Sequence, residues 1–216
     1  TAPTVSVTSP AALSNELTFD YALTFSESVT GLTTSDFAIT GTGCSVASVA
    51  GSAASYSVRV QSCADGASAY LAMSANAVSD SALNLGPVVT STFATVTVDR
   101  SASAPTWSAA PATSYASPSF QVDFTEAITG FTASDISNTG SATGCVIAVS
   151  AMVNRYTIAT TGCSLGTVQL AIAQGAYGDA LGNTGPQTVS ASSVTTVIAQ
   201  PAPAPTPTPN PTATPT

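Results

Sequence analysis

Carboxylates occur in two pairs that have the same surroundings. Glu27 and Asp36 lie in and after the tract Phe-x-Glu-x-x-Thr-Gly, and Glu126 and Asp135 lie in and after a second copy of that tract. Glycosidases use two acids of this kind, one as the proton donor and one as the base or nucleophile. An active site usually occurs once in a protein, whereas this pair is repeated together with its surroundings. The repetition therefore argues against a glycosidase.

Calcium binding is the second chemistry that these acids suggest. Ca²⁺ takes about six to eight oxygen ligands. Two equivalent sets of side chains offer such oxygens: Glu27, Asp36, Asp80 and Asn84, and then Glu126, Asp135, Asp179 and Asn183. Asp99 lies between the two sets in the sequence, where an ion that joins two repeats would bind.

Turn formation is the competing explanation for the same residues. Thr33 to Asp36 and Thr132 to Asp135 both have the spacing of a capping box, in which a hydroxyl and a carboxylate bind the free amides of a short helical turn. Asp80 and Asp179 stand in turn sequences, where Asp usually bonds to the backbone. We favour the turn interpretation, and we expect no catalytic residue, no bound metal and no cofactor.

The composition argues against several other functions. The sequence has no histidine and no lysine, so neither a Ser-His-Asp nor a Ser-Lys nucleophile can be built. Its only cations are Arg59, Arg100 and Arg155, and the net charge is -8, which disfavours nucleic acid and anionic membrane surfaces as partners. No apolar run reaches the roughly eighteen residues of a membrane span, so we do not expect membrane insertion.

Aromatic residues give limited support to carbohydrate binding. The one tryptophan, Trp107, follows Pro105 closely, and we interpret it as a residue that packs between the two modules rather than as a sugar platform. Tyr56 and Tyr156 occupy matching strand positions and are predicted to belong to the core. No role is assigned to the other tyrosines at this stage: Tyr70, Tyr115 and Tyr177.

The four cysteines predict two disulfides. With no histidine and no Cys-x-x-Cys pair, they are not typical of a metal site. A repeat unit must carry its own pairing if it is to be duplicated as a whole, so we predict Cys44–Cys63 and Cys145–Cys163. Disulfides indicate an oxidising compartment.

Strands must position these residues. Leu17, Phe19, Tyr21, Leu23 and Phe25 alternate with polar or small residues, the pattern of a strand with one buried face. Further strands are expected at 5–8, 37–40, 44–49, 56–61, 69–73 and 89–98, and in the second repeat at 120–124, 145–149, 156–159, 168–172 and 189–198. The spacing predicts an all-β fold of two sandwich domains, 1–99 and 100–198.

The last segment, 199–216, has a different composition. Proline alternates with other residues from Pro201 to Pro211, which predicts an extended polyproline II tail or linker. Its alternation of Pro and Thr is typical of O-glycosylated stalks. The candidate acceptors are Thr206, Thr208, Thr212 and Thr214.

Several of these motifs, taken together, resemble bacterial Ig-like (Big) tandem repeats. The resemblance lies in the Phe-Ser-Glu-x-Val-Thr-Gly tract, the Gly-Cys...Tyr-x-Val...Cys middle, the Asp-Ala-Leu-Gly-Asn-Thr-Gly-Pro of 179–186 and the Asp-Arg...Ala-Pro-Thr of 99–106. It implies an Ig-like sandwich in a secreted or cell-surface protein. The first repeat departs from the pattern at Leu83, where the glycine before Asn84 is missing, so we expect the backbone of that turn to differ.

The leading hypothesis is therefore a non-enzymatic, extracellular or cell-surface structural protein, whose disulfide-locked modules act as a stalk or spacer. Its partners would be other copies of itself or neighbouring repeats of a larger surface protein. Two alternatives remain open. One is a self-assembling subunit of a filament or surface layer, and the other is an adhesin module that binds glycans or a host.

Overall fold

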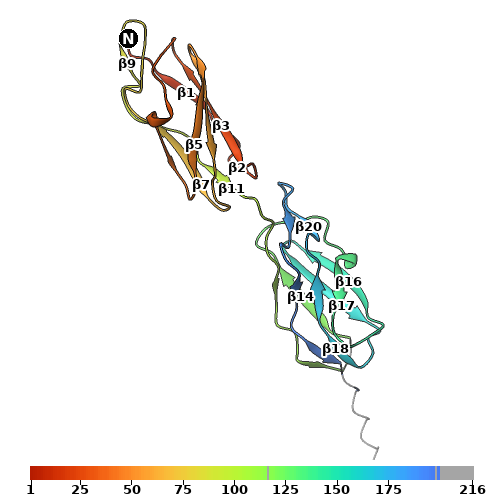
Figure 1. Ribbon diagram of the computed structural model, residues 1–216. Helices are drawn as coiled ribbons and strands as arrows, with labels where there is room; N and C mark the ends of the chain where they lie inside the picture. Colours follow the sequence, from red (N-terminus) through yellow and green to blue (C-terminus); the bar gives the residue numbers. More distant parts are fainter. Residues whose placement is uncertain (116, 198, 200–216) are drawn as a thin grey trace, which may run out of the picture. The chain divides into compact units, whose positions relative to one another are not determined.

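The computed structural model describes residues 1–115, 117–197 and 199. These residues form β-strands and two short 3-10 turns, and they divide into two compact units (Figure 1). The first unit contains Thr1–Ser103 and Tyr177–Gln187, and the second contains Ala104–Ala176 and continues from Thr188. Within the described residues, no helix is long and apolar enough to cross a membrane. The all-β fold class is confirmed, whereas the domain boundary at 99/100 stays a prediction.

One sheet of the first unit is built around the strand with the clearest alternation. Phe19, Tyr21, Leu23 and Phe25 are buried, and the residues between them are exposed, as the sequence predicts. The sheet is antiparallel and has the order β1 (Val5–Thr8), β3 (Thr18–Phe25), β6 (Ser55–Gln61) and β5 (Ser45–Ser52).

The other sheet contains the central strand β7. Its members are β4 (Phe37–Thr40), β7 (Ser68–Met73), β10 (Ser91–Thr92), β11 (Val96–Val98) and β2 (Leu13–Ser14). β4 and β11 pair with β7 in antiparallel fashion, while β2 pairs with β11 in parallel. With strands named in chain order, the two sheets have the A-B-E-D and C-F-G orders of an immunoglobulin sandwich.

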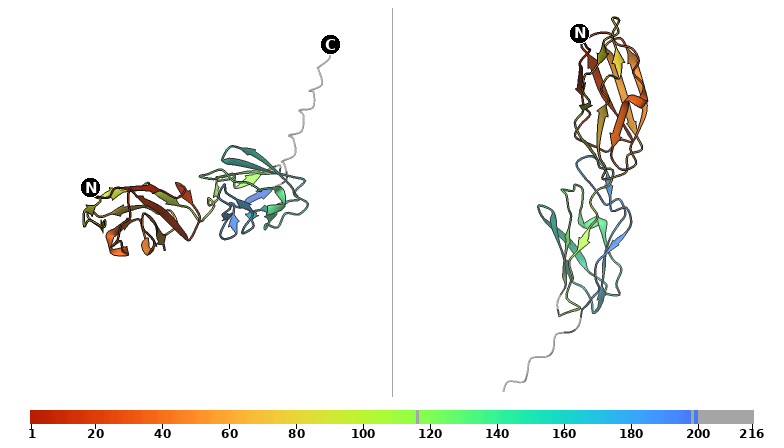
Figure 2. Two further views of the ribbon diagram at one scale, coloured as in Figure 1. Left: turned by 90° about the horizontal axis from the view of Figure 1, so that it is seen from above. Right: turned by 90° about the vertical axis from the view of Figure 1, so that its left-hand side faces the viewer.

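The core of the first unit lies between these two sheets (Figure 2). Tyr21 and Leu23 from β3 pack in one cluster with Leu71 and Met73 from β7, and all four are fully buried. Burial of a side chain of this size stabilises a fold by about 1.5–3 kcal/mol. The alternating pattern thus supplies most of the apolar contact that holds the sheets together.

The second unit repeats this strand order. One sheet runs β12 (Thr106–Trp107), β14 (Ser119–Asp123), β17 (Arg155–Thr161), β16 (Val146–Met152). The facing strands are β13 (Thr113–Ser114), β23 (Thr195–Val197) and β18 (Gly166–Val168), and then β15 (Ile136–Asn138), β19 (Leu170–Ile172) and β22 (Ser190–Ala191). Its core includes Phe120, Val122, Ile158 and Leu170.

The last strand of each repeat differs from the prediction. The sequence predicts one strand at 89–98 and one at 189–198, but the structure has β10 and β11 in the first case and β22 and β23 in the second. Three residues lie between Thr92 and Val96, but only two residues of β7 lie between their partners Ala72 and Ala69. The extra residue makes a bulge. The hydroxyl of the buried Tyr21 donates to the carbonyl of Ala94 within that bulge. This hydrogen bond takes the place of a ladder bond there.

Two disulfides join Cys44 to Cys63 and Cys145 to Cys163. These are the pairs that the repeat logic predicts. Each connects the start of one strand to the end of its neighbour, β5 to β6 and β16 to β17, so each closes a loop inside one sheet. The paired cysteines are 19 and 18 residues apart.

We expect the double variant Cys44→Ser/Cys63→Ser to lose about 3 kcal/mol of stability, because a loop of this length is released in the unfolded chain. Urea unfolding of the first unit measures the loss. Cys145→Ser/Cys163→Ser is the matched variant for the second unit. A midpoint that does not move in either case would show that the loop closure contributes nothing.

Candidate functional site

The Thr–Asp tracts form the predicted capping boxes. In the 3-10 turn Thr34–Asp36, the Asp36 carboxylate accepts the backbone N–H and the hydroxyl of Thr33, at 2.7 and 2.8 Å. In the turn Ala133–Asp135, Asp135 accepts the same two bonds from Thr132, at the same distances. The capping prediction is confirmed in both repeats. One oxygen of each carboxylate is therefore committed to its own turn.

Asp80 closes the turn between β8 (Val78–Ser79) and β9 (Leu85–Gly86). Its Oδ1 accepts the backbone N–H groups of Ala82 and Asn84, at 2.8 and 2.9 Å, and its Oδ2 accepts the Asn84 amide at 2.7 Å. The bond from the Asn84 side chain, followed by the bond from the Asn84 backbone, lowers the pKa of Asp80 below its ordinary value of 3.8. The carboxylate acts as the acceptor that holds this turn closed.

Asp179 does the same between β20 (Tyr177–Gly178) and β21 (Thr184–Gly185). It accepts the backbone N–H groups of Leu181 and Asn183 and the side-chain amide of Asn183. Asp80 and Asp179 are both buried. The predicted turn role is therefore confirmed at both positions.

The expectation of a different backbone at Leu83 is wrong. Leu83 has φ +65° and its equivalent Gly182 has φ +85°, so both residues are left-handed. The hydrogen bonds to the preceding Asp are the same in both turns, and they impose the conformation whichever residue stands there. Leucine pays a steric cost at this φ that glycine does not.

Segment 177–187 is anchored by the rest of the first unit. The side-chain amide of Asn15 donates to the carbonyl of Leu181 at 2.8 Å, and that of Asn183 donates to the carbonyl of Asp99 at 2.9 Å. The buried Tyr177 hydroxyl donates to the carbonyl of Ser103 at 2.7 Å. Three hydrogen bonds thus hold the segment where strands β2 and β11 end.

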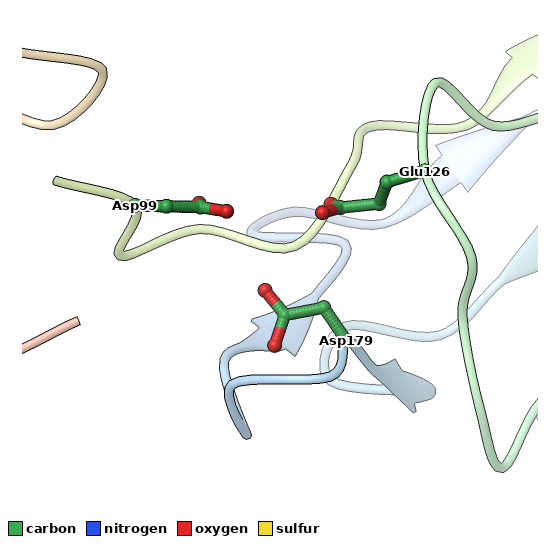
Figure 3. Close-up of side chains that lie close together, drawn as sticks. All are labelled: Asp99, Glu126 and Asp179. Atoms are coloured by element: carbon green, nitrogen blue, oxygen red, sulfur yellow. The ribbon is translucent and has the colours of Figure 1, made fainter. Parts of the chain in front are cut away.

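The acidic residues proposed for calcium come together only in part. The carboxylates of Asp99 and Asp179, both in the first unit, lie within 4.8 Å of each other (Figure 3). Glu126, also drawn in Figure 3, belongs to the second unit. Among the acidic residues of the described ranges, Glu27, Asp36 and Asp80 do not form a group of three that close, and Asp135 belongs to no such group. The cation ligands considered as an alternative for the first repeat are therefore not gathered in such a group within the described residues.

The aromatic residues are used in packing. Tyr56 packs edge-on against Phe25, and Tyr156 packs edge-on against Phe124, so the core assignment of both tyrosines is confirmed. Trp107 is half-buried and donates its indole N–H to Ser190 at 3.0 Å. Trp107 and Ser190 both belong to the second unit, so this bond lies within one module.

The three arginines are also engaged. Arg59 pairs with Asp20 across β3 and β6, and Arg155 pairs with Asp123 across β14 and β17. Arg100 donates to the carbonyls of Glu16 and Cys63. Cations dispersed in this way form no basic stripe that would bind a nucleic acid.

Sequence reasoning did not identify Asn15, Asp99 and Ser103 as the anchor of segment 177–187. Asn15 acts through its amide, but Asp99 and Ser103 act through backbone carbonyls, which every residue carries. The sequence offers the side-chain donors, but it does not show which backbone carbonyls accept from them. Tyr177, which was left unassigned, proves to be a buried member of this anchor.

The strand order of the sheets in each repeat and the disulfide within each repeat define a disulfide-bonded Ig-like sandwich. Residues 1–98 match the family model described as bacterial Ig-like domain. No curated protein matches the sequence.

A solved structure, the N-terminal part of the bacterial S-layer protein SbsC, is similar at 17% identity with a TM-score of 0.32. The match covers 92% of this chain and 44% of that one, so this chain spans less than half of its length. A similarity this low says nothing about function.

We predict that Asp80→Asn lowers the urea midpoint at neutral pH. The folded pKa of Asp80 lies below the unfolded one, so its carboxylate stabilises the fold above the unfolded pKa, and this contribution is lost as the pH falls through the folded pKa. The difference between wild type and variant should therefore shrink in acid, below pH 3.8. Asp20→Asn, which removes an exposed ion pair, should change the midpoint much less. Equal midpoints for wild type and Asp80→Asn at neutral pH would contradict the role of this carboxylate.

We also predict that EDTA and added Ca²⁺ leave the melting temperature unchanged. Ligand binding to the native state raises stability, so a structural calcium site would respond to both reagents. A melting temperature that rises with Ca²⁺, returns with EDTA and no longer responds in Asp179→Asn would show that the Asp99–Asp179 pair binds a cation.

Proposed function

We propose that this chain is a non-enzymatic, extracellular structural protein whose Ig-like modules act as a stalk or spacer. The observation that carries the proposal is that the polar side chains suited to chemistry are used to build turns. Asp36, Asp135, Asp80 and Asp179 all accept hydrogen bonds from their own turns. In each of these carboxylates at least one oxygen is therefore used by the turn itself.

The family supports this proposal. Residues 1–98 match the bacterial Ig-like domain model, and the resemblance to that family implies a module of a secreted or cell-surface protein. A fold alone does not assign a function. The family resemblance and the use of the acids in turns both favour a structural module. Together they make a spacer a better interpretation than an enzyme.

The cysteines support an extracellular location. All four are joined in disulfides, one within each unit. Disulfides of this structural kind persist in oxidising compartments and are rare where thiols are kept reduced. An apolar core of this size also gains from them, because each sandwich is small.

The predictions for the tail fall outside the described residues. The segment 199–216, apart from 199, and its acceptors Thr206, Thr208, Thr212 and Thr214 therefore remain predictions from composition. We propose that the tail continues the spacer and carries O-linked glycans. The adhesin alternative gains no specific support, since Trp107 is half-buried and hydrogen-bonded.

Protease treatment of intact source cells tests the proposed location. We expect the chain to be degraded on intact cells while a cytoplasmic marker survives, because a surface spacer is accessible from outside. Labelling with a maleimide before reduction should modify none of the four cysteines. A chain that resists protease until the cells are lysed, with reactive thiols, would overturn an extracellular function.

A further inference from the structure

The two repeats present the same hairpin with different surfaces. Segment 78–88 and segment 177–187 share the Asp–Asn turn and the Gly-Pro that follows. The side chains on the turns differ. Leu83, Leu85 and Val88 stand where the second repeat has Gly182, Thr184 and Gln187. The first hairpin is therefore apolar where the second is small or polar.

These apolar side chains are exposed. Leu83 is 80% exposed, Leu85 is 53% exposed and Val88 is 69% exposed. Leu83 also occupies a left-handed conformation, in which leucine is strained and glycine is not. The first repeat is thus destabilised at this turn by backbone strain at Leu83 and by the exposure of apolar side chains. These side chains do not belong to its core.

The second hairpin shows what such a turn can contact. It is held by Asn15 and by the carbonyl of Asp99, at the end of the first unit where β2 and β11 finish. Asn183 uses its amide twice, for Asp179 and for the Asp99 carbonyl. Among bonds within the described residues, the equivalent Asn84 amide reaches only Asp80 and keeps one donor to spare.

The corresponding end of the second unit is apolar. β13 and β23 pair there as β2 and β11 do, with Ser114 opposite Val197 as Ser14 is opposite Val98. The residue after Ser114 is Tyr115, in place of Asn15, and the residue before Gly166 is Leu165, in place of Asp65. Tyr115 is 59% exposed and Leu165 is 63% exposed.

We propose that segment 78–88 of one chain docks on the β13–β23 end of the second unit of another copy. Leu83 and Leu85 would pack against Tyr115 and Leu165, and the spare Asn84 donor would reach a backbone carbonyl, as Asn183 does. The second hairpin is held inside this chain by Asn15 and by the carbonyl of Asp99, whereas the apolar hairpin and the apolar end both expose their large side chains. A second copy is the one partner that necessarily carries both surfaces.

The contact joins two different surfaces, so it is heterologous. A heterologous contact continues from copy to copy unless its rotation closes a ring. Association should therefore grow with concentration beyond a dimer. This assembly goes beyond the spacer role, because a spacer can act as a single copy.

Sedimentation velocity of the full chain at increasing concentration tests the proposal. We expect the wild-type sedimentation coefficient to rise steadily with concentration. Leu83→Asn/Leu85→Thr blocks the hairpin, and Asn tolerates the left-handed conformation. Tyr115→Asn/Leu165→Asp removes the apolar side chains from the β13–β23 end. It replaces them with the residue types that the first unit has at Asn15 and Asp65. Each double variant alone should stay monomeric, with an unchanged cooperative melt.

An equal mixture of the two double variants should form dimers and nothing larger, because only one intact hairpin and one intact end can then meet. The matched control is Met152→Thr/Val153→Asn, which removes two exposed apolar residues, one of them also left-handed, from the β16–β17 turn. It should associate as the wild type does. A monomeric wild type, a mixture that does not dimerise, or a control that stays monomeric would overturn the docking and leave the spacer function untouched.

Discussion

The sandwich ends of this protein depend on carboxylates that accept several N–H bonds at once. Many backbone amides of the loops there lie outside the strand ladders, so they need other acceptors. Asp80 and Asp179 each accept three such bonds. Asp65, between β6 and β7, is a similar acceptor. It accepts the N–H of Arg100 and the hydroxyl of Ser101, two residues that follow β11. These bonds lower the pKa of Asp65, with the Ser101 bond as the largest cause.

This constraint explains an unusual composition. Only 6% of the residues are charged, and the acids outnumber the basic residues by 11 to 3. Acids that accept backbone bonds need no counter-ion, because the amides themselves stabilise the negative charge. The few arginines are placed on strand pairs and at the end of the first unit. In Asp36, Asp65, Asp80, Asp135 and Asp179, the charge thus helps to build the fold.

The sequence predicts those parts of the fold that local side-chain patterns specify. The alternation in β3, the capping boxes at Asp36 and Asp135 and the Asx bonds at Asp80 are local, so residue types and spacing specify them. The sequence predicts one continuous last strand in each repeat and misses the bulges before β11 and β23. Each bulge depends on the register with a neighbouring strand, which is β7 in the first repeat and β18 and β19 in the second. The anchor of segment 177–187 was missed because it uses backbone carbonyls. Turn geometry at Leu83 was misjudged because hydrogen bonding to Asp80 outweighs the preference of the single residue.

That last case bears on how the repeats diverged. If only folding mattered, glycine would be the better residue at position 83, since the turn keeps a left-handed φ in either repeat. A strained leucine that is also exposed lowers stability in two ways, and Leu85 and Val88 beside it are exposed as well. Contiguous apolar surface on a soluble module usually marks a contact. The same backbone thus carries a polar surface in segment 177–187, which Asn15 anchors, and exposed apolar side chains in segment 78–88. This is the arrangement expected if each hairpin selects a different neighbour.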